Sequence, residues 1–118
     1  MNNFEIDFFT LDNGFCPIRE YLDSTDKKMR AKILWTIGLL ETNGNMLTMP
    51  YSEHLQDGIF ELRTKQGSNI SRVLYFFYVG KKIILTHGFN KKTNKVPPGE
   101  IAKAKKYLDI YLSRQKGE

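Results

Sequence analysis

The sequence predicts an α+β fold, in which helices pack against a small antiparallel β-sheet, because the period of its apolar residues changes twice. Between residues 26 and 44 apolar residues recur at helical spacing, from Ile59 onward they alternate as in a β-strand, and after residue 98 the helical spacing returns. The predicted order is a strand, two helices, a three-stranded meander and a final helix. We expect the N-terminal strand and the meander to form one sheet within a single domain, residues 1–118.

The first half of the chain carries clear boundary signals for its helices. Thr25 or Asp26 can cap the second helix, and Gly44 can end it. The predicted elements are a strand at 4–9, helices at 16–25 and 26–44, and a connecting loop at 45–58. The second helix turns one apolar face inward, formed by Met29, Ile33, Ile37 and Leu40.

The second half predicts a meander followed by a helix. Its strands are expected at 59–65, 70–79 and 82–89, and the last helix turns Ile101, Ala104, Leu108 and Leu112 inward. A two-residue turn at 80–81 would pair Leu74 with His87 and Arg72 with Phe89. The strand at 70–79 is apolar on both faces, which is typical of a central strand.

A four-residue loop at 66–69 would set Arg63 directly opposite Arg72, on the face that also carries His87 and Lys91. Two like charges facing each other across strands destabilise a sheet unless an anion lies between them. The pair therefore predicts a phosphate-binding site. It also predicts that replacing Arg72 by alanine removes function and leaves the fold intact.

Composition limits the classes of function. The chain of 118 residues has a net charge of +5, but residues 1–80 hold 8 Lys and Arg against 10 Asp and Glu, whereas residues 81–118 hold 10 against 3. Such a one-sided excess attracts polyanions. We expect a cytoplasmic protein, because no apolar run is long enough to span a membrane and the N-terminus does not resemble a signal peptide.

The residue types fit cleavage of RNA at the 2′-hydroxyl, which needs a proton acceptor, cations around the phosphate and an acid for the leaving oxygen. The predicted catalytic residues are Arg63, Arg72, His87, Lys91 and Lys92, and the residues expected to bind RNA or the ribosome are Lys65, Lys95, Lys103, Lys105 and Lys106. No cluster with metal-ligand spacing or cofactor motif is present, so we expect neither a metal nor a cofactor.

Each residue also has a structural interpretation. Arg63 can pair with Glu61, Arg72 can extend from the end of its strand, and His87 can be a hydrogen-bonded core histidine. The aromatic run at residues 75–78 fits a platform for stacking bases, or more simply a buried core. The single cysteine, Cys16, fits a packing residue.

The elements "DGIFELRTK", "RVLYFFYVG" and "ILTHGFNKKTNKVPPGEIAKA", in this order, resemble the phage-derived HigB-like branch of the RelE toxin superfamily. The resemblance implies a toxin of a type II toxin–antitoxin system that cleaves messenger RNA on the ribosome without a metal. It also implies a helix-turn-helix antitoxin, similar to HigA, that silences the toxin and contacts operator DNA.

Matched residue by residue, the resemblance assigns Arg63, Arg72, His87, Lys91 and Lys92 to the active site. A tyrosine near the C-terminus of RelE has no aligned counterpart among Tyr107 and Tyr111, so the general base stays open. The competing hypothesis is a binding module for nucleic acid or protein that keeps the fold without the cleavage chemistry.

Overall fold

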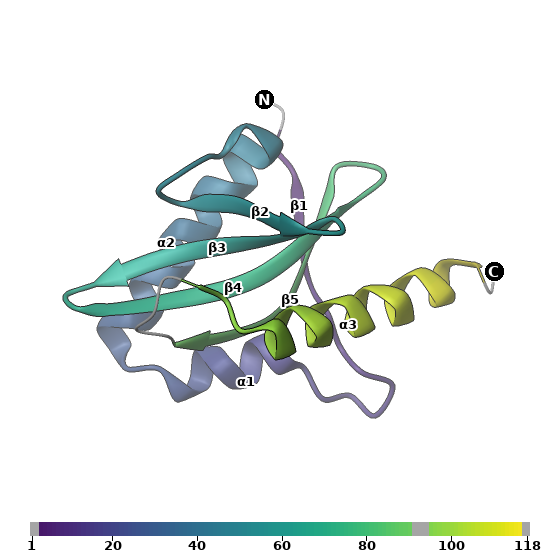
Figure 1. Cartoon of the computed structure of the whole chain (residues 1–118), viewed down its shortest axis with the longest axis horizontal. Coiled ribbons are helices and arrows are strands. Elements are labelled where there is room, and N and C mark those ends of the chain that lie inside the picture. The colour runs from purple at the N-terminus through teal and green to yellow at the C-terminus, as the bar shows by residue number, and fades with distance from the viewer. Residues whose placement is uncertain (1–2, 91–94, 117–118) are drawn as a thin grey trace.

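The computed structural model describes residues 3–90 and 95–116 of the chain (Figure 1). Its elements are β1 (Glu5–Phe8), α1 (Pro17–Ser24), α2 (Lys27–Asn43), the short 3₁₀ helix η1 (Gly44–Met46), β2 (Ser52–Gln56), β3 (Ile59–Gln66), β4 (Asn69–Tyr78), β5 (Lys82–Asn90) and α3 (Pro98–Lys116). The predicted strand, helix and meander elements are all present. In the described part of the chain, no helix has the length and apolar character that crossing a membrane requires.

The sheet differs from the predicted one in two respects. Its five strands lie in the order β1-β5-β4-β3-β2, and β1 runs parallel to β5, so the sheet is mixed and not antiparallel. The interpretation of residues 45–58 as a loop was also wrong, because β2 pairs with β3 at the sheet edge. The sequence of β2, "SEHLQ", is mostly polar, as is typical of an edge strand, and so lacks the alternation that reveals a buried one.

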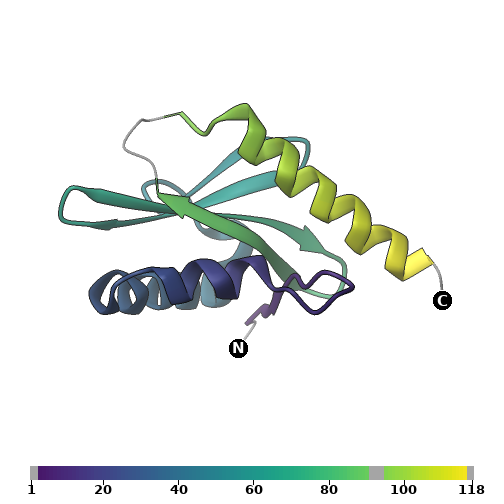
Figure 2. The ribbon, with the colours of Figure 1, turned by 90° about the horizontal axis from the view of Figure 1, so that it is seen from below.

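Helices cover both faces of the sheet. Figure 2 shows α1 and α2 together on one face and α3 on the other. Each face has its own apolar core, with Leu62, Val73 and Leu85 toward α1 and α2, and Leu74 and Phe76 toward α3. Asp26 caps α2 by accepting a 2.8 Å hydrogen bond from the Met29 backbone, and Gly44 ends the helix, both as predicted.

Strand β4 is central, as predicted, and is buried on both faces from residue 71 to residue 76. Its aromatic residues belong to the core: Tyr75 and Phe76 are buried, and Phe77 and Tyr78 are half-buried. Burial raises the pKa of the Tyr75 hydroxyl to about 12 despite its hydrogen bond to Ser52. The platform for stacking bases that the run at 75–78 suggested is therefore not present on this strand.

The predicted strand register holds, although the turns differ in length. Gln66 pairs with Asn69, which leaves a two-residue turn and sets Arg63 opposite Arg72. The β4–β5 turn is one residue longer than predicted, since Tyr78 pairs with Lys82. A bulge between the pairs Tyr75–Leu85 and Leu74–His87 adds Thr86 to β5 and so restores the predicted pairing.

Gly88 lies where β5 passes under α1, and its missing side chain lets the Tyr21 ring approach the strand. A Cβ at Gly88 would overlap that ring. The Tyr21 hydroxyl bonds to Ser71 and Asn90, at 2.7 and 2.9 Å, so the ring cannot move away without losing these bonds. This close approach anchors α1 on the sheet.

We therefore expect Gly88→Ala to lower the free energy of unfolding by roughly 1–3 kcal/mol, the usual cost of overpacking. The matched control is Gly99→Ala, because nothing lies within 4 Å of a Cβ added there. In a helix this control change should be neutral or slightly stabilising. Urea unfolding of both variants checks the prediction, and equal stability would contradict it.

Candidate functional site

The candidate site lies on the face of the sheet that α3 covers only in part. The helix runs from the middle of the sheet toward the end that carries the β4–β5 turn (Figure 1). Nearer the β3–β4 turn, no described helix covers this face. The polar residues of β3, β4 and β5 on this face therefore lie beside the first turn of α3, and only some of them reach the solvent.

Strand pairing arranges these residues in two rows. One row contains Glu61, Leu74 and His87, and the neighbouring row contains Arg63, Arg72 and Phe89. Adjacent strands are about 4.8 Å apart, so the two ends of a row are separated by roughly 10 Å. The structure thus places an acidic side chain and a titratable basic side chain at the two ends of the row beside the arginine pair, on one face.

Arg72 is buried together with Glu61. Arg72 has no exposed surface and Glu61 is 2% exposed, and the guanidinium Nη1 lies 3.5 Å from the carboxylate Oε1. Burial raises the pKa of Glu61, although the charges of Arg72 and Arg63 act in the opposite direction. The anion that offsets the repulsion between the two arginines is therefore a carboxylate of the chain itself.

This burial changes the role expected for Arg72. A guanidinium without exposed surface does not present itself to a phosphate, so direct contact of Arg72 with a ligand is not what the geometry offers. Arg63, its neighbour across the strands, is half-buried and reaches the surface. Arg72 and Glu61 lie beneath that surface and support it.

His87 is 5% exposed and hydrogen-bonded through both ring nitrogens. Its Nε2 lies 2.9 Å from Glu100 Oε1 in the first turn of α3, and its Nδ1 lies 3.1 Å from the Thr86 hydroxyl, which donates to the Leu74 carbonyl at 3.0 Å. Burial lowers the pKa of the imidazole; Glu100 opposes the shift and Lys103 adds to it.

The hydrogen bonds around His87 have two arrangements that differ by one proton. A protonated ring donates to both Thr86 and Glu100. A neutral ring can keep its hydrogen on Nε2 for Glu100, and the Thr86 hydroxyl then turns from the Leu74 carbonyl to donate to Nδ1. Glu100 is the member of this pair that solvent reaches, with a side chain 28% exposed.

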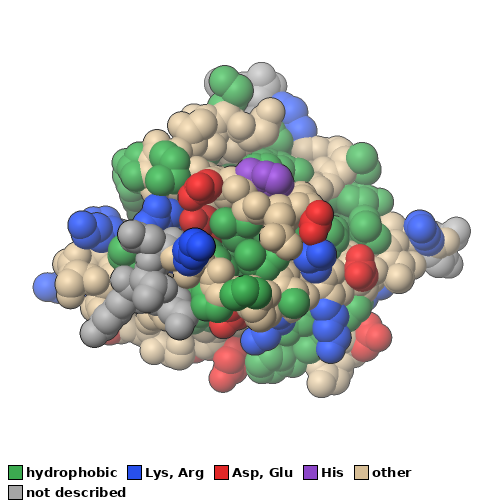
Figure 3. All heavy atoms as spheres, in the orientation of Figure 1, with side chains coloured by type: hydrophobic (Ala, Val, Ile, Leu, Met, Phe, Trp, Pro, Cys, Tyr) green, Lys and Arg blue, Asp and Glu red, His purple; other side chains and the backbone are tan. Residues whose placement is uncertain are grey.

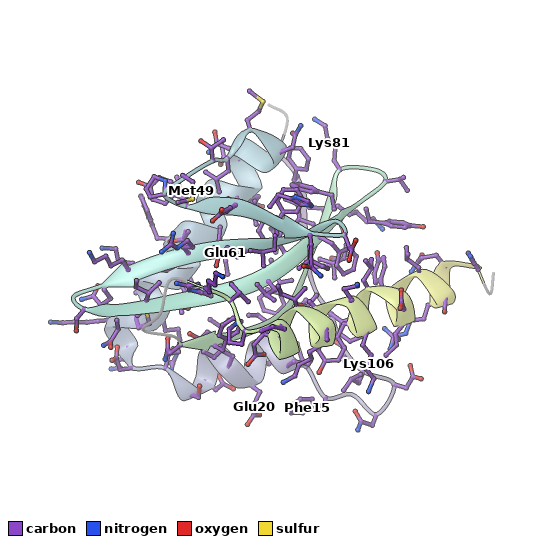
Figure 4. The ribbon with its side chains drawn as sticks, viewed as in Figure 1. Phe15, Glu20, Met49, Glu61, Lys81 and Lys106 are labelled. Carbon is purple, nitrogen blue, oxygen red and sulfur yellow. The ribbon has the colours of Figure 1, made fainter. Side chains whose placement is uncertain are left out.

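A basic pocket lies beside the arginine row, at the sheet edge. It has a volume of about 230 Å³ and is lined by Pro50, Tyr51, Arg63, Lys65 and Ile70. Arg63 is held there by a 2.7 Å backbone hydrogen bond to the Tyr51 carbonyl. Met49, which precedes Pro50 and Tyr51 in the chain, projects at the same edge of the sheet (Figure 4).

The predicted lysines do not form one group. Lys105 forms a 2.7 Å ion pair with Asp57, and Lys103 lies 3.9 Å from Glu100. Figure 4 shows Lys106 on the side of α3 away from β3. Lys95 takes part in an interaction within the protein. Lys91 and Lys92 lie outside the described residues.

Some residues of the site were missed in the sequence. Glu61 was considered only as a partner for Arg63, whereas it pairs with buried Arg72; Glu100 and Tyr51 were not identified. Glu100 is an acidic residue in the first turn of a predicted helix, which usually indicates only a helix-stabilising charge. His54 packs against Phe60, which belongs to the core of the opposite face, so it is remote from His87.

The geometry defines a class of protein: a small α+β protein whose sheet face carries surface cations and a buried histidine that is hydrogen-bonded to a partly exposed glutamate. In residues 3–90 and 95–116, no group of three or more His, Cys, Asp or Glu side chains could hold a metal ion. The chain belongs to the family described as Phage derived protein Gp49-like (DUF891), which it matches over residues 20–109.

This is a RelE/HigB-like toxin-related family, associated with the toxins of toxin–antitoxin systems. The matched residues include both rows, the basic pocket and the first half of α3. Among curated proteins, no relative matches with significant similarity.

Arg72 and Arg63 should respond differently to removal. Arg72→Ala leaves Glu61 as a buried charge without this partner, so, in contrast to the intact fold expected from the sequence, we expect the free energy of unfolding to fall by roughly 3–5 kcal/mol. Arg63→Ala should cost about 1 kcal/mol or less. Replacing both members of the pair, Arg72→Met with Glu61→Leu, should recover most of the loss, and urea unfolding of the three variants measures this. Unchanged stability in Arg72→Ala would refute the structural role.

The environment of His87 predicts that the free energy of unfolding depends on pH. In the unfolded chain the pKa of histidine is about 6.5, whereas the pKa of His87 in the folded protein is lower. In the pH window between these two pKa values, the unfolded state therefore binds more protons than the folded state. The stabilisation is present above this window and is lost as the pH falls through it. The stability difference between wild type and His87→Gln should therefore shrink from pH ~7 to pH ~5. Exposed His54→Gln is the control, and a pH-independent His87 difference would contradict the prediction.

Proposed function

We propose that this protein is the toxin of a type II toxin–antitoxin system, an endoribonuclease of the HigB branch that cleaves messenger RNA on the ribosome without a metal. The observation that supports it is the pairing of surface cations with a proton-exchanging His87–Glu100 pair, on one sheet face, in a chain of a toxin-related family. Its cognate helix-turn-helix antitoxin, similar to HigA, silences the toxin and contacts operator DNA.

In the proposed reaction, the exposed Glu100 carboxylate takes the proton from a ribose 2′-hydroxyl. The 2′ oxygen then attacks the adjacent phosphorus, the bond from phosphorus to the 5′ oxygen breaks, and the 5′ oxygen leaves with a proton from solvent. His87 orients Glu100 through their 2.9 Å hydrogen bond. The products are a 2′,3′-cyclic phosphate and a 5′-hydroxyl.

The charge that develops on the phosphate needs nearby cations. Arg63 and Lys65 supply them from the basic pocket, and Lys103 supplies a further charge beside Glu100. Arg72 acts indirectly, since it is buried with Glu61 and supports the strand position of Arg63. Direct phosphate contact is thus assigned to the exposed cations only.

The competing function is a binding module without chemistry. The observation that favours it is burial: Arg72 and His87, two of the residues expected to be catalytic, have 0% and 5% exposure. Structural ion pairs and hydrogen-bonded histidines have the same appearance. A chemical readout therefore decides between the two functions.

Cleavage should produce 2′,3′-cyclic phosphate or 3′-phosphate ends on messenger RNA in a reconstituted translation reaction. Glu100→Gln should slow this cleavage by roughly 10²–10⁴, because an amide cannot accept the proton. Glu20→Gln removes an exposed carboxylate in α1, on the other face of the sheet, and should leave the rate unchanged.

A 3′-hydroxyl end would indicate metal-activated water and contradict the reaction. Full activity in Glu100→Gln would remove that residue from it. In cells, induction should arrest growth unless the antitoxin gene beside it is expressed too. Growth that is indifferent to induction would favour the binding module.

A further inference from the structure

Two exposed aromatic rings meet at the sheet edge, outside the rows described above. Trp35 of α2 is 55% exposed and Tyr51, just before β2, is 36% exposed, and their ring centroids lie 6.2 Å apart at an angle of 67°. Large aromatic rings normally bury most of their surface, so two exposed rings in contact point to an interaction surface.

The two rings join two pockets. Tyr51 lines the 230 Å³ basic pocket with Arg63 and Lys65, whereas Trp35 lines a second pocket of about 600 Å³. The other residues that line the second pocket are Lys28, Ala31, Lys32 and Gln66. The aromatic and cationic residues of the two pockets form a continuous path through the contact between Trp35 and Tyr51. We call this path the aromatic edge, and it comprises Lys28, Lys32, Trp35, Tyr51, Arg63 and Lys65.

Positive charge flanks both rings. Lys28 and Lys32 lie one helical turn apart beside Trp35, and Arg63 and Lys65 lie beside Tyr51. Among the described residues, neither pocket is lined by an aspartate or a glutamate. In the view of Figure 3, several lysine and arginine side chains lie at the end of the molecule that carries the β3–β4 turn, and others lie elsewhere on this face. The charge count along the sequence did not reveal this group of cations, because residues 1–80 have more acidic than basic residues overall.

We propose that the aromatic edge binds single-stranded RNA, as an extension of the candidate site around the β2 side of the sheet onto α2. Bases stack on exposed aromatic faces without regard to sequence, and cations on either side hold the backbone. The proposal deepens the proposed function, because the RNA held here is the strand that enters the candidate site. Trp35 and the α2 lysines lie outside the residues proposed for cleavage.

An acidic helical polypeptide is the other occupant to consider. Leu34, the neighbour of Trp35, is 50% exposed and would be a natural contact for apolar side chains of such a partner. The charges favour RNA, because cations flank both rings whereas Leu34 lines neither pocket. Leu34 therefore distinguishes the two occupants.

Trp35 is the only tryptophan of the chain and reports directly on its own environment. The probe is an oligoadenylate of about ten nucleotides, within the range of known single-strand site sizes. Stacking of a base on the indole should quench its fluorescence in a saturable manner. A fluorescein label on the same oligonucleotide gives the affinity of variants that lack the tryptophan.

Trp35→Leu should weaken binding by roughly 5- to 150-fold, the range for loss of one stacked base, and Trp35→Phe by less. Lys28→Gln with Lys32→Gln should flatten the log–log salt dependence by about 1.4, at about 0.7 per phosphate of a single strand. The control with equal charge loss is Lys81→Asn with Lys116→Gln, because Lys81 lies at the β4–β5 turn, away from the aromatic edge (Figure 4). Asparagine was chosen for position 81 because it tolerates the positive φ of 63° found there.

Leu34→Ala should bind the oligonucleotide as the wild type does. Unchanged affinity and salt slope in the Trp35 and lysine variants would overturn the proposal, and messenger RNA cleavage by the wild type would then leave the proposed function intact. An acidic amphipathic peptide that shifts Trp35 emission to shorter wavelength, and loses this effect in Leu34→Ala, would assign the surface to a polypeptide instead. Saturable quenching by oligoadenylate in a protein that does not cleave would support the aromatic edge and reject the nuclease.

Discussion

The site depends on the position of β4, because this strand is paired on both sides and buried on both faces. A shift of one residue would turn Val73 and Tyr75 toward α3 and move Arg72 into the core beneath α1 and α2. Both apolar cores oppose such a shift. The arginine row and the histidine row therefore stay on the face beside α3, and neighbouring strands add residues to that face at fixed positions.

The bulge at Thr86 is part of the same constraint. It compensates for the longer β4–β5 turn and brings His87 opposite Leu74. It also brings the Thr86 hydroxyl to His87 Nδ1 and the Leu74 carbonyl, so one irregular residue sets both the position and the hydrogen bonding of the imidazole. Bulges beside functional sites commonly re-aim a side chain in this way.

Buried and exposed polar residues of this face have different roles. Glu61, Arg72 and His87 are almost without exposed surface, and each has an ionic or hydrogen-bonded partner. Burying such groups is costly, and their net effect on stability is small compared with the cost of separating them. Arg63, Lys65 and Glu100 lie at the surface above them, where a ligand can make contact. The buried pairs orient these residues, and the exposed residues carry out the proposed chemistry.

Local patterns in the sequence determined most elements and the pairing of Arg63 with Arg72. Helical and alternating periods, helix caps and turn residues are properties of short segments, so they can be recognised without a structure. Only the tertiary structure decided the parallel pairing of β1 with β5, the edge strand β2, and the contacts of Glu61 with Arg72 and Glu100 with His87. These join residues distant in the chain or depend on burial. The path from Lys28 and Lys32 through Trp35 to Tyr51 is of the same kind, because a charge count along the chain does not show which residues share a surface.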